Sequence, residues 1–319
     1  MAEVAQLRVT RAAQIRKQPQ DQQPWLVESL WGAGAVGIIG RAPKTCKTWL
    51  ALEIAVAVAS GLPCLGRFRV PCPGPVLIFT AEDPPHQVRR RIESLSLARN
   101  ADFPSLDVRL IVETSLRLDR TQDLQRLHLT LANHQPKLLV LDPYVRLQSA
   151  DENDARQVSA ILSDLRELSR IFHTAVALVH HARKNATRNP GQALRGSGDF
   201  WAWGDSNLYI TRNNDSLQLT TEHRAAPSPP PLSFQLLAPD DPPDQQPSPI
   251  CLQLQEQSAP PTSLSLEQRI LAYLRNADPT THRTLRAALR VRTSNLSDAL
   301  RELETDGRLT RTPLGWTLA

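Results

Sequence analysis

The sequence is poor in cysteine, and the four cysteines that it contains do not form a recognisable set. They are Cys46, Cys64, Cys72 and Cys251, and no two of them stand in a Cys-x-x-Cys pair. Zinc sites and disulfide frameworks both depend on cysteines at ordered spacings. The sequence therefore predicts neither kind of site, and its cysteines fit the reduced thiols of a cytosolic protein.

A long hydrophobic run is also missing. No apolar run reaches the ~18 residues that a membrane-spanning helix needs, and Glu53 interrupts the longest apolar helix. The first residues lack the apolar centre of a signal peptide. We therefore expect a soluble, cytoplasmic protein without a membrane partner.

The charge balance shows no large excess of either sign. Lys and Arg number 37 against 32 Asp and Glu, which gives a formal net charge of +5 and a pI near 9.3. This excess permits contact with nucleic acid without establishing it. With 319 residues, of which 41% are hydrophobic, the chain can form one large domain and a small one.

Residues 35–60 predict a strand, a loop and a helix. A short apolar run at 35–39 is typical of a buried strand, and the helix that follows carries apolar residues around most of its circumference. In a phosphate-binding P-loop, backbone N–H groups and a lysine bind phosphate oxygens, and a hydroxyl group binds Mg²⁺. Lys47 and Thr48 supply the lysine and the hydroxyl. The residues that resemble the P-loop are Pro43, Lys44, Thr45, Cys46, Lys47 and Thr48.

This loop departs from the P-loop pattern at both glycines. Counting back from Lys47, the two glycine positions hold Arg41 and Cys46, and Gly40 comes one residue too early. A residue other than glycine at positive φ costs about 1–2 kcal/mol, so Cys46 is tolerable if its Cβ points away from the nucleotide. The departure bears on hydrolysis more than on binding. The alternative is that Lys44 and Lys47 merely begin a surface helix.

Two acidic residues follow predicted buried strands further along the chain. The strand at 75–80 leads into Glu82, which we interpret as the base that acts on the attacking water. The alternative for this acidic pair is that Asp83 caps the next helix, which would leave Glu82 without a role. An apolar run that ends at Asp142 is a Walker B pattern and predicts a ligand of Mg²⁺. A turn residue before a proline is the alternative for Asp142.

The strand predicted at 175–181 ends in two histidines, His180 and His181. Neighbouring side chains on a strand point to opposite faces. We therefore expect one ring to sense the γ-phosphate or the catalytic water and the other to pack, with a structural role as the alternative for His181. Residues 182–198 then form a basic, glycine-containing loop suited to contact with phosphate.

Patterns of composition divide the rest of the chain. Residues 1–24 predict a flexible N-terminal arm, with contact to a neighbouring subunit as a second interpretation. Residues 25–237 form the main domain, which ends in three short strands. A Pro-rich linker follows at 238–263, interrupted by a short strand at 250–254.

On the helix predicted at 85–98, three arginines at 89–91 are interpreted as a solvated face and, second, as a DNA contact.

The last segment, 264–319, predicts three helices and a hairpin, which is the order of a winged helix-turn-helix. Nine Arg against six acidic residues give it 9 − 6 = +3. Acidic residues on the third helix make docking to a protein the alternative to DNA binding. The arginines available for DNA phosphates are Arg283, Arg290, Arg292, Arg301, Arg308 and Arg311.

The motifs taken together, Pro-Lys-Thr-Cys-Lys-Thr, Ala-Glu-Asp-Pro, Val-Leu-Asp-Pro and Val-His-His, resemble the RepA-type branch of RecA-like ATPases over residues 25–225. This branch includes hexameric plasmid replicative helicases. The resemblance implies an α/β fold: a RecA-like P-loop core with a mostly parallel sheet and antiparallel C-terminal strands, here followed by the small winged-helix domain. It implies a homo-oligomer, as a hexameric ring, in which a neighbour supplies an arginine. The candidates for that arginine are Arg195 and Arg212.

We therefore expect a Mg²⁺-dependent ATPase that acts on DNA, as a replicative helicase of a mobile element. ATP and Mg²⁺ are the expected cofactors. Single-stranded DNA is the expected partner of the core and duplex DNA that of the tail. The alternative is a nucleotide-gated DNA-binding regulator with little or no hydrolysis. A small-molecule phosphotransferase is disfavoured, because the sequence contains no recognisable lid or acceptor pocket.

Overall fold

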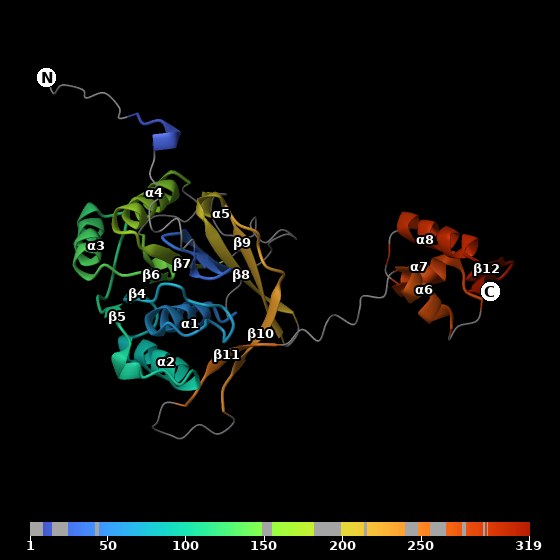
Figure 1. The fold of residues 1–319 in the computed structure, drawn as a ribbon, viewed down its shortest axis with the longest axis horizontal. Coiled ribbons are helices and arrows are strands. Elements are labelled where there is room, and N and C mark those ends of the chain that lie inside the picture. Colours follow the sequence, from blue (N-terminus) through green and yellow to red (C-terminus); the bar gives the residue numbers. More distant parts are fainter. Residues whose placement is uncertain are drawn as a thin grey trace. The chain divides into compact units, whose positions relative to one another are not determined.

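The computed structural model consists of two units, residues 1–255 and 256–319, which are described separately (Figure 1). No described helix is long and apolar enough to cross a membrane. The residues that the structure describes are 9–14, 25–41, 45–148, 155–181, 199–213, 216–239, 248–255, 266–275, 279–289, 291 and 293–319.

One nine-stranded sheet forms the centre of the first unit. Its strands in chain order are β3 (Val36–Arg41), β4 (Val76–Thr80), β5 (Val108–Ile111), β6 (Leu138–Asp142), β7 (Ala175–His181), β8 (Ser206–Asn213), β9 (Ser216–His223), β10 (Leu232–Leu237) and β11 (Cys251–Leu254). Their order across the sheet is β11-β10-β9-β8-β3-β7-β6-β4-β5. The pairs from β8 to β5 are parallel, and those from β8 to β11 are antiparallel.

Helices cover both faces of this sheet (Figure 1). On one face, α1 (Lys47–Ser60) and α2 (Pro85–Ala98) share a core, which includes Ile39 of β3. On the other, α3 (Thr121–His134), α4 (Ala155–Phe172) and α5 (Asp199–Trp203) share a second core, which includes Ile38. Adjacent residues of a strand point to opposite faces, so the unbroken apolar run at 35–39 fills both cores.

Helix α1 is buried along nearly its whole length, as its apolar sequence predicts. Its one acidic residue, Glu53, has no exposed surface. The Glu53 carboxylate accepts a hydrogen bond from the backbone N–H of Leu65 at 2.7 Å and pairs with the Arg99 guanidinium. A buried charge with such partners is tolerated, and α1 is thereby fixed against the loop that follows it.

The contact between β3 and β8 depends on Gly37. A Cβ atom at this position would lie 1.7 Å from the backbone oxygen of Ser206. Only glycine permits so close an approach of two backbones. The glycine in the strand that precedes the predicted P-loop therefore allows β8 to join the parallel part of the sheet.

Some elements were not evident in the sequence. A small hairpin of β1 (Trp25–Val27) and β2 (Trp31–Gly32) precedes β3, and α5 lies between β7 and β8 in the chain. The predicted strand at 250–254 is β11, and it pairs with β10. The sheet therefore continues beyond residue 237, where we expected the linker to begin. Single 3₁₀ turns occur at Ala12–Gln14, Phe103–Ser105 and Tyr144–Arg146.

The second unit contains α6 (Leu266–Leu274), α7 (His282–Leu289), α8 (Thr293–Thr305) and a hairpin of β12 (Leu309–Thr312) with β13 (Gly315–Leu318). This is the predicted order of three helices and a hairpin. The unit has its own hydrophobic core, in which Leu285, Leu296 and Leu300 are almost fully buried. Thr280 bridges to Trp316 and ties the start of α7 to the hairpin.

Candidate nucleotide site

The predicted phosphate-binding loop and both predicted acids meet at one cavity of about 290 Å³, here called the strand-end cavity. It lies beyond the carboxyl ends of β4 and β6, which run side by side with Thr80 opposite Asp142. The start of α1 lines its other side. The carboxyl ends of parallel strands meet at one edge of a sheet, so residues far apart in sequence come together there. Its lining residues are Thr45, Cys46, Lys47, Thr48, Trp49, Glu82, Asp83, Arg91, Asp142 and Val179.

Asp142 and Thr48 are in direct contact. The Thr48 hydroxyl donates a hydrogen bond to the Asp142 carboxylate at 2.6 Å, although 94 residues separate the two in sequence. Asp142 is only 7% exposed. Burial raises the pKa of Asp142 to about 6, against an opposing effect of the Thr48 hydrogen bond. A hydroxyl and a carboxylate at this distance are a suitable pair of oxygen ligands for Mg²⁺.

Lys47 is the buried cation of the cavity, with 5% of its surface exposed. Burial lowers the pKa of its ammonium group to about 8, and the nearby charge of Asp142 partly opposes this effect. A desolvated ammonium group next to acids gains more from a phosphate ligand than an exposed one does. Lys47 therefore lies where a phosphate group in the cavity could bind to it, and its role as the lysine of a P-loop stays a prediction.

Cys46 adopts the backbone conformation that glycine favours. Its φ is 59° and its ψ is 26°, in the left-handed region. The backbone C=O of Cys46 accepts a hydrogen bond from the N–H of Leu50 at 2.9 Å, so the turn leads directly into α1. Burial raises the pKa of the Cys46 thiol, which the charges of Arg212 and Lys47 partly oppose. The sequence-based expectation of positive φ at a residue other than glycine is met.

Glu82 and Asp83 each have an arginine partner. Arg146, in the 3₁₀ turn after β6, lies 3.2 Å from the Glu82 carboxylate, and both side chains are about half exposed. Arg91 of α2 donates to both oxygens of Asp83, at 2.5 and 3.2 Å. Its guanidinium also lies 5.5 Å from the centre of the Trp49 ring. The cavity therefore has a second, arginine-containing wall.

Two interpretations from the sequence need correction here. Arg91 does not belong to a solvated face, because it pairs with Asp83 and covers Trp49. Asp83 does not cap α2, because the N-cap residue is Pro84 and no side chain makes a cap hydrogen bond there. Asp83 and Arg91 are eight residues apart in sequence, with Asp83 before α2 and Arg91 within it. No sequence pattern predicts that two residues at this spacing form an ion pair.

His180 packs in the protein interior and does not line the strand-end cavity. Its ring stacks on Phe200 with a centroid distance of 4.3 Å and meets the edge of Tyr144 at 5.6 Å. His180 is 1% exposed, and its neighbours belong to the core under α4 and α5. We expected one histidine of the pair to pack, and His180 is that one. The His181 side chain lies outside the described residues, and its sensing role stays a prediction.

Other predicted site residues fall outside the described part of the chain or away from the cavity lining. Pro43, Lys44 and Arg195 lie outside the described residues. Arg212 is exposed at the end of β8, near enough to Cys46 for its charge to lower the thiol pKa. Arg212 therefore lies beside the loop of its own chain, and its use by a neighbouring chain stays a prediction.

A second cavity of about 280 Å³, here called the side cavity, shares Trp49 and Arg91 with the first. It is lined by residues of α2, by Ala238 and Pro239 after β10, and by Ser248 and Ile250 before β11. Ser248 lines it and is 6% exposed, and its hydroxyl has no hydrogen-bond partner in the described part of the chain. A buried polar group without a partner calls for an explanation, and a bound polar ligand would supply one.

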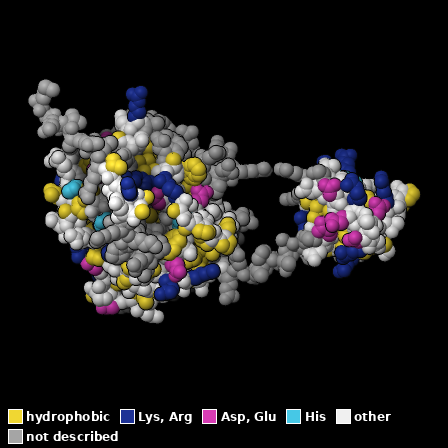
Figure 2. Space-filling model, turned by 45° about the horizontal axis from the view of Figure 1, so that its top comes forward, with side chains coloured by type: hydrophobic (Ala, Val, Ile, Leu, Met, Phe, Trp, Pro, Cys, Tyr) yellow, Lys and Arg dark blue, Asp and Glu magenta, His cyan; other side chains and the backbone are white. Residues whose placement is uncertain are grey.

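The predicted DNA contacts of the second unit are partly described. Arg283, Arg301, Arg308 and Arg311 are exposed, whereas 290 and 292 lie outside the described residues. Arg301 pairs with Asp298 at 3.4 Å, and Arg311 lies 5.9 Å from the Trp316 ring centre. Figure 2 shows basic and acidic side chains interspersed on this unit. This mixed surface leaves both DNA and protein open as its partner.

Comparison with known proteins agrees with this geometry. The sequence profile of an AAA domain matches residues 2–187. The fold is similar to a solved DnaB-like replicative helicase, with a TM-score of 0.50 and 16% identity over 64% of this chain and 56% of that chain. A RadB recombinase matches with a TM-score of 0.48 and 14% identity over 64% of this chain and 88% of that one. The predicted RecA-like P-loop fold is confirmed.

Proposed function

The chain belongs to the AAA domain family, and from this premise we propose that it binds ATP with Mg²⁺ at the strand-end cavity, hydrolyses it and acts on DNA. The RecA-like P-loop fold suits nucleotide use. The observation that carries the proposal is the convergence of Lys47, Thr48, Glu82 and Asp142 on one cavity. These four side chains come from three separate parts of the sequence and cover the roles that phosphoryl transfer requires.

Thr48 and Asp142 are the residues that would hold Mg²⁺. Their oxygens lie 2.6 Å apart, and both atom types are ones that the ion prefers. Among the described residues, no group of three or more His, Cys, Asp or Glu side chains could hold a metal. This fits an ion whose remaining ligands are phosphate oxygens and water. When bound, Mg²⁺ would neutralise the charge that develops on the phosphates.

Lys47 and the first turn of α1 would hold the phosphate chain. The backbone N–H groups at the start of a helix carry partial positive charge and favour anions. Lys47, buried at the same end, adds a full charge. The space for the sugar and base would be the side cavity, because it shares the Trp49 and Arg91 wall with the strand-end cavity. There the Ser248 hydroxyl would gain the partner that it lacks.

Glu82 would accept a proton from the water that attacks the γ-phosphate. It lines the strand-end cavity from the tip of β4, next to the strand that ends in Asp142. Arg146, at 3.2 Å, would orient the carboxylate. A base in this position needs contact with a water molecule and not with the nucleotide itself. Its removal should therefore leave binding intact.

The test is to measure ATP binding and ATP hydrolysis on the same variants. General-base removal by Glu82→Gln should reduce turnover about 100-fold or more while ATP affinity stays close to that of the wild type. Glu113→Gln, an exposed change outside the cavity, is the matched control. Equal loss of affinity and turnover in Glu82→Gln would reject the role of Glu82 as base.

Action on DNA is the second part of the proposal. A fold shared with a DnaB-like replicative helicase, a net charge of +5 and a second unit with exposed arginines support it. A ring-shaped motor should hydrolyse ATP faster in the presence of single-stranded DNA and should unwind duplexes. The candidate in second place is a nucleotide-gated DNA-binding regulator, which Cys46 in place of a P-loop glycine favours. If the protein binds a specific duplex sequence and hydrolyses no ATP with any DNA, the regulator is the correct function.

A further inference from the structure

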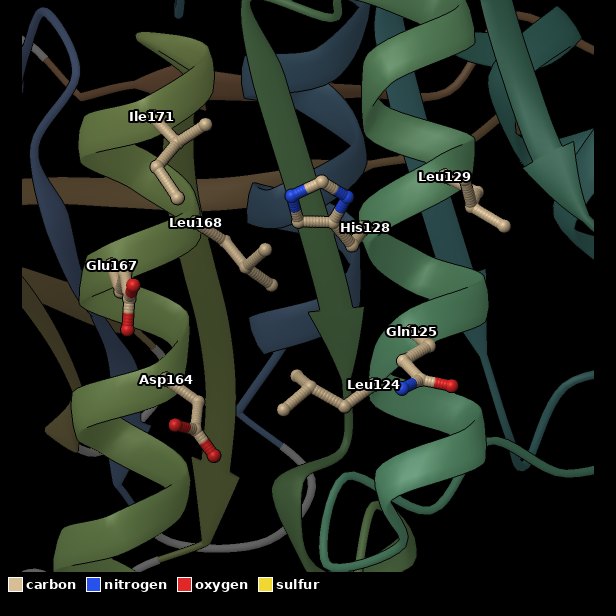
Figure 3. Close-up of a pocket in the computed structure, with 8 residues that line it drawn as sticks. All are labelled: Leu124, Gln125, His128, Leu129, Asp164, Glu167, Leu168 and Ile171. Atoms are coloured by element: carbon tan, nitrogen blue, oxygen red, sulfur yellow. The ribbon is translucent and has the colours of Figure 1, made fainter. Parts of the chain in front are cut away.

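Two hollows of the first unit lie apart from the strand-end cavity and the side cavity. One is a groove of about 530 Å³ between α3 and α4, with the exposed side chains of Leu129 and Ile171 at its sides (Figure 3). Contacts between aliphatic side chains have no direction, so they do not identify a ligand for this groove. The other is a pocket of about 440 Å³ next to α5, here called the α5 pocket, in which polar and aromatic side chains combine.

The α5 pocket lies at the opposite edge of the sheet from the strand-end cavity. Its lining includes Gly204 after α5, Asn207 near the start of β8 and Glu222 near the end of β9. Because β8 runs parallel to β3 and antiparallel to β9, these residues lie at the edge where the parallel strands begin. The strand-end cavity lies where the parallel strands finish. A ligand of the α5 pocket is therefore separate from a nucleotide at Lys47.

Trp201 gives the α5 pocket an open aromatic wall. The residue is 55% exposed, whereas tryptophan is highly buried on average. Its ring N–H donates a hydrogen bond to the Glu222 carboxylate at 2.9 Å, which joins α5 to β9 and fixes the ring. An indole ring that is held open to solvent in this way can stack on a planar ligand.

Glu222 gives the pocket a strong hydrogen-bond acceptor. Among the described residues, no lysine or arginine forms an ion pair with Glu222. Arg224 lines the same pocket but pairs with Asp205, at 3.3 Å. A carboxylate has about four acceptor sites, and the Trp201 bond occupies one of them. Glu222 can therefore accept hydrogen bonds from two N–H groups of a ligand.

Asn207 places a donor next to this acceptor. It stands directly opposite Glu222 in the β8–β9 pair, so the two side chains share a face of the sheet, with their Cβ atoms roughly 5 Å apart. Asn207 is 3% exposed, and its Oδ1 atom accepts a hydrogen bond from the N–H of Ile38 at 3.1 Å. Its NH₂ group has no partner in the described part of the chain. Gly204 makes room for the amide, because a Cβ atom there would lie 1.9 Å from Asn207 Oδ1.

The three side chains together match one edge of a guanine base. That edge carries two neighbouring N–H donors, at N1 and N2, with the carbonyl oxygen O6 beside them. The donors suit Glu222, the carbonyl suits Asn207, and the ring suits the face of Trp201. Uracil and thymine have one N–H between two carbonyls, and adenine and cytosine have no ring N–H on this edge. An arginine side chain has donors only and would leave the Asn207 amide unpaired.

We propose that the α5 pocket binds a guanine base, either of a free nucleotide or of a single-stranded nucleic acid. Glu222 accepts hydrogen bonds from N1–H and N2–H, Asn207 donates to O6, and Trp201 stacks on the ring. Arg224 lines the same pocket with 52% of its side chain exposed, where a phosphate of the ligand can contact it. This site goes beyond the proposed ATP hydrolysis and action on DNA, and no residue of the strand-end cavity takes part in it.

Calorimetric titration of guanosine monophosphate (GMP) and inosine monophosphate (IMP) tests the proposal. Both are titrated into the full-length Lys47→Ala chain, so that phosphate binding at the strand-end cavity does not contribute. IMP lacks only the N2 amino group, and it should bind about tenfold more weakly than GMP, because one hydrogen bond to Glu222 is lost.

Glu222→Gln, which keeps an acceptor for the Trp201 N–H, identifies the residue responsible. In this variant GMP should bind about tenfold more weakly or worse, and the difference between GMP and IMP should disappear. Glu113→Gln, an exposed change outside the pocket, is the control and should leave both affinities unchanged.

A thymidine oligonucleotide that contains one guanine, compared with one that contains none, distinguishes the two sources of the base. A gain in affinity from the guanine that Glu222→Gln abolishes supports the proposal with a single strand as the source. A difference between GMP and IMP without such a gain supports it with a free nucleotide. Equal affinity for GMP and IMP and no gain from the guanine, or a guanine preference that persists in Glu222→Gln, would overturn it. Displacement of GMP by N-acetylarginine amide would also overturn it, in favour of a cationic protein partner.

Discussion

Asp142 lines the strand-end cavity, and its buried carboxylate lowers the stability of the folded protein at pH 7. Burial holds its carboxyl at a pKa of about 6, against an ordinary value of 3.8. The folded protein therefore binds this proton more tightly than the unfolded chain does. Its contribution to stability is fully present below pH 4, is lost as the pH rises to 6, and stays lost at pH 7.

Asp142→Asn should therefore stabilise the ligand-free protein at pH 7. An asparagine can still accept the Thr48 hydrogen bond, and removal of the buried charge should raise the free energy of unfolding by on the order of 2 kcal/mol. Urea unfolding at pH 7 and near pH 4 is the measurement, and the gain should be small at the lower pH. The same variant should lose the Mg²⁺ dependence of nucleotide binding. A loss of stability at pH 7 would contradict the electrostatic account.

Two groups with displaced pKa values should set the pH range of the proposed nucleotide binding. Asp142 is ionised above about pH 6, and Lys47 is charged below about pH 8. Affinity for Mg²⁺-ATP should therefore be highest between these values and fall on both sides. Calorimetric titration from about pH 5 to pH 9 checks this. In Lys47→Arg the alkaline fall should disappear, because arginine stays charged there. If affinity still falls at alkaline pH in this variant, a group other than Lys47 causes the fall.

The cavity residues that belong to a local sequence motif could be predicted. Those that are identified only by an ion pair with a distant residue could not. The positions of Lys47, Thr48, Glu82 and Asp142 follow from motif order, because strand ends of a parallel sheet meet at one edge. Arg91 and Arg146 were missed, since an arginine on a helix or in a turn has no pattern that names its acidic partner. The choice between the two histidines likewise required the structure, because either face of β7 is buried.

At the scale of elements, the apolar runs predicted the parallel strands well. Each is short and bounded by loop residues, and residues 138–141 of β6 are all buried, whereas those of β5 at the edge of the sheet are half-buried. The hairpin β1–β2, helix α5 and the pairing of β11 were not predicted. The elements β1, β2 and α5 are only two to five residues long, which is too short for a periodic pattern. The strand β11 was predicted, but its pairing with β10 depends on contacts that the sequence of either strand does not specify.

The junction of β3 and β8 gives a test at this scale. Gly37→Ala would put a Cβ atom 1.7 Å from the Ser206 backbone oxygen, so the two strands would have to separate. We expect a loss of about 3 kcal/mol in the free energy of unfolding, measured in urea. Gly74→Ala is the matched control. The three atoms nearest to its Cβ, the first at 2.7 Å, would all belong to the exposed Lys137 side chain and none to a backbone, so we expect a smaller loss there. Equal effects of the two changes would contradict the close approach.

At the scale of the whole molecule, the proposed nucleotide site lies within one of the two units. Every residue of the strand-end cavity belongs to the unit of residues 1–255, and the second unit has a core of its own. This division was evident in the sequence from the Pro-rich change in composition. The partner of the second unit was not, since its basic and acidic residues alternate and composition alone does not choose between DNA and protein.

Calorimetric titration of Mg²⁺-ATP tests the central claim, that the start of α1 and the tip of β6 form a nucleotide site. The wild type, the chain that ends at Gln255 and Lys137→Ala, an exposed lysine change, should bind alike. Lys47→Ala should bind about 100-fold more weakly, because it lacks a buried, charge-assisted contact with phosphate. A wild type that does not bind, or a Lys47→Ala variant with unchanged affinity, would contradict the account.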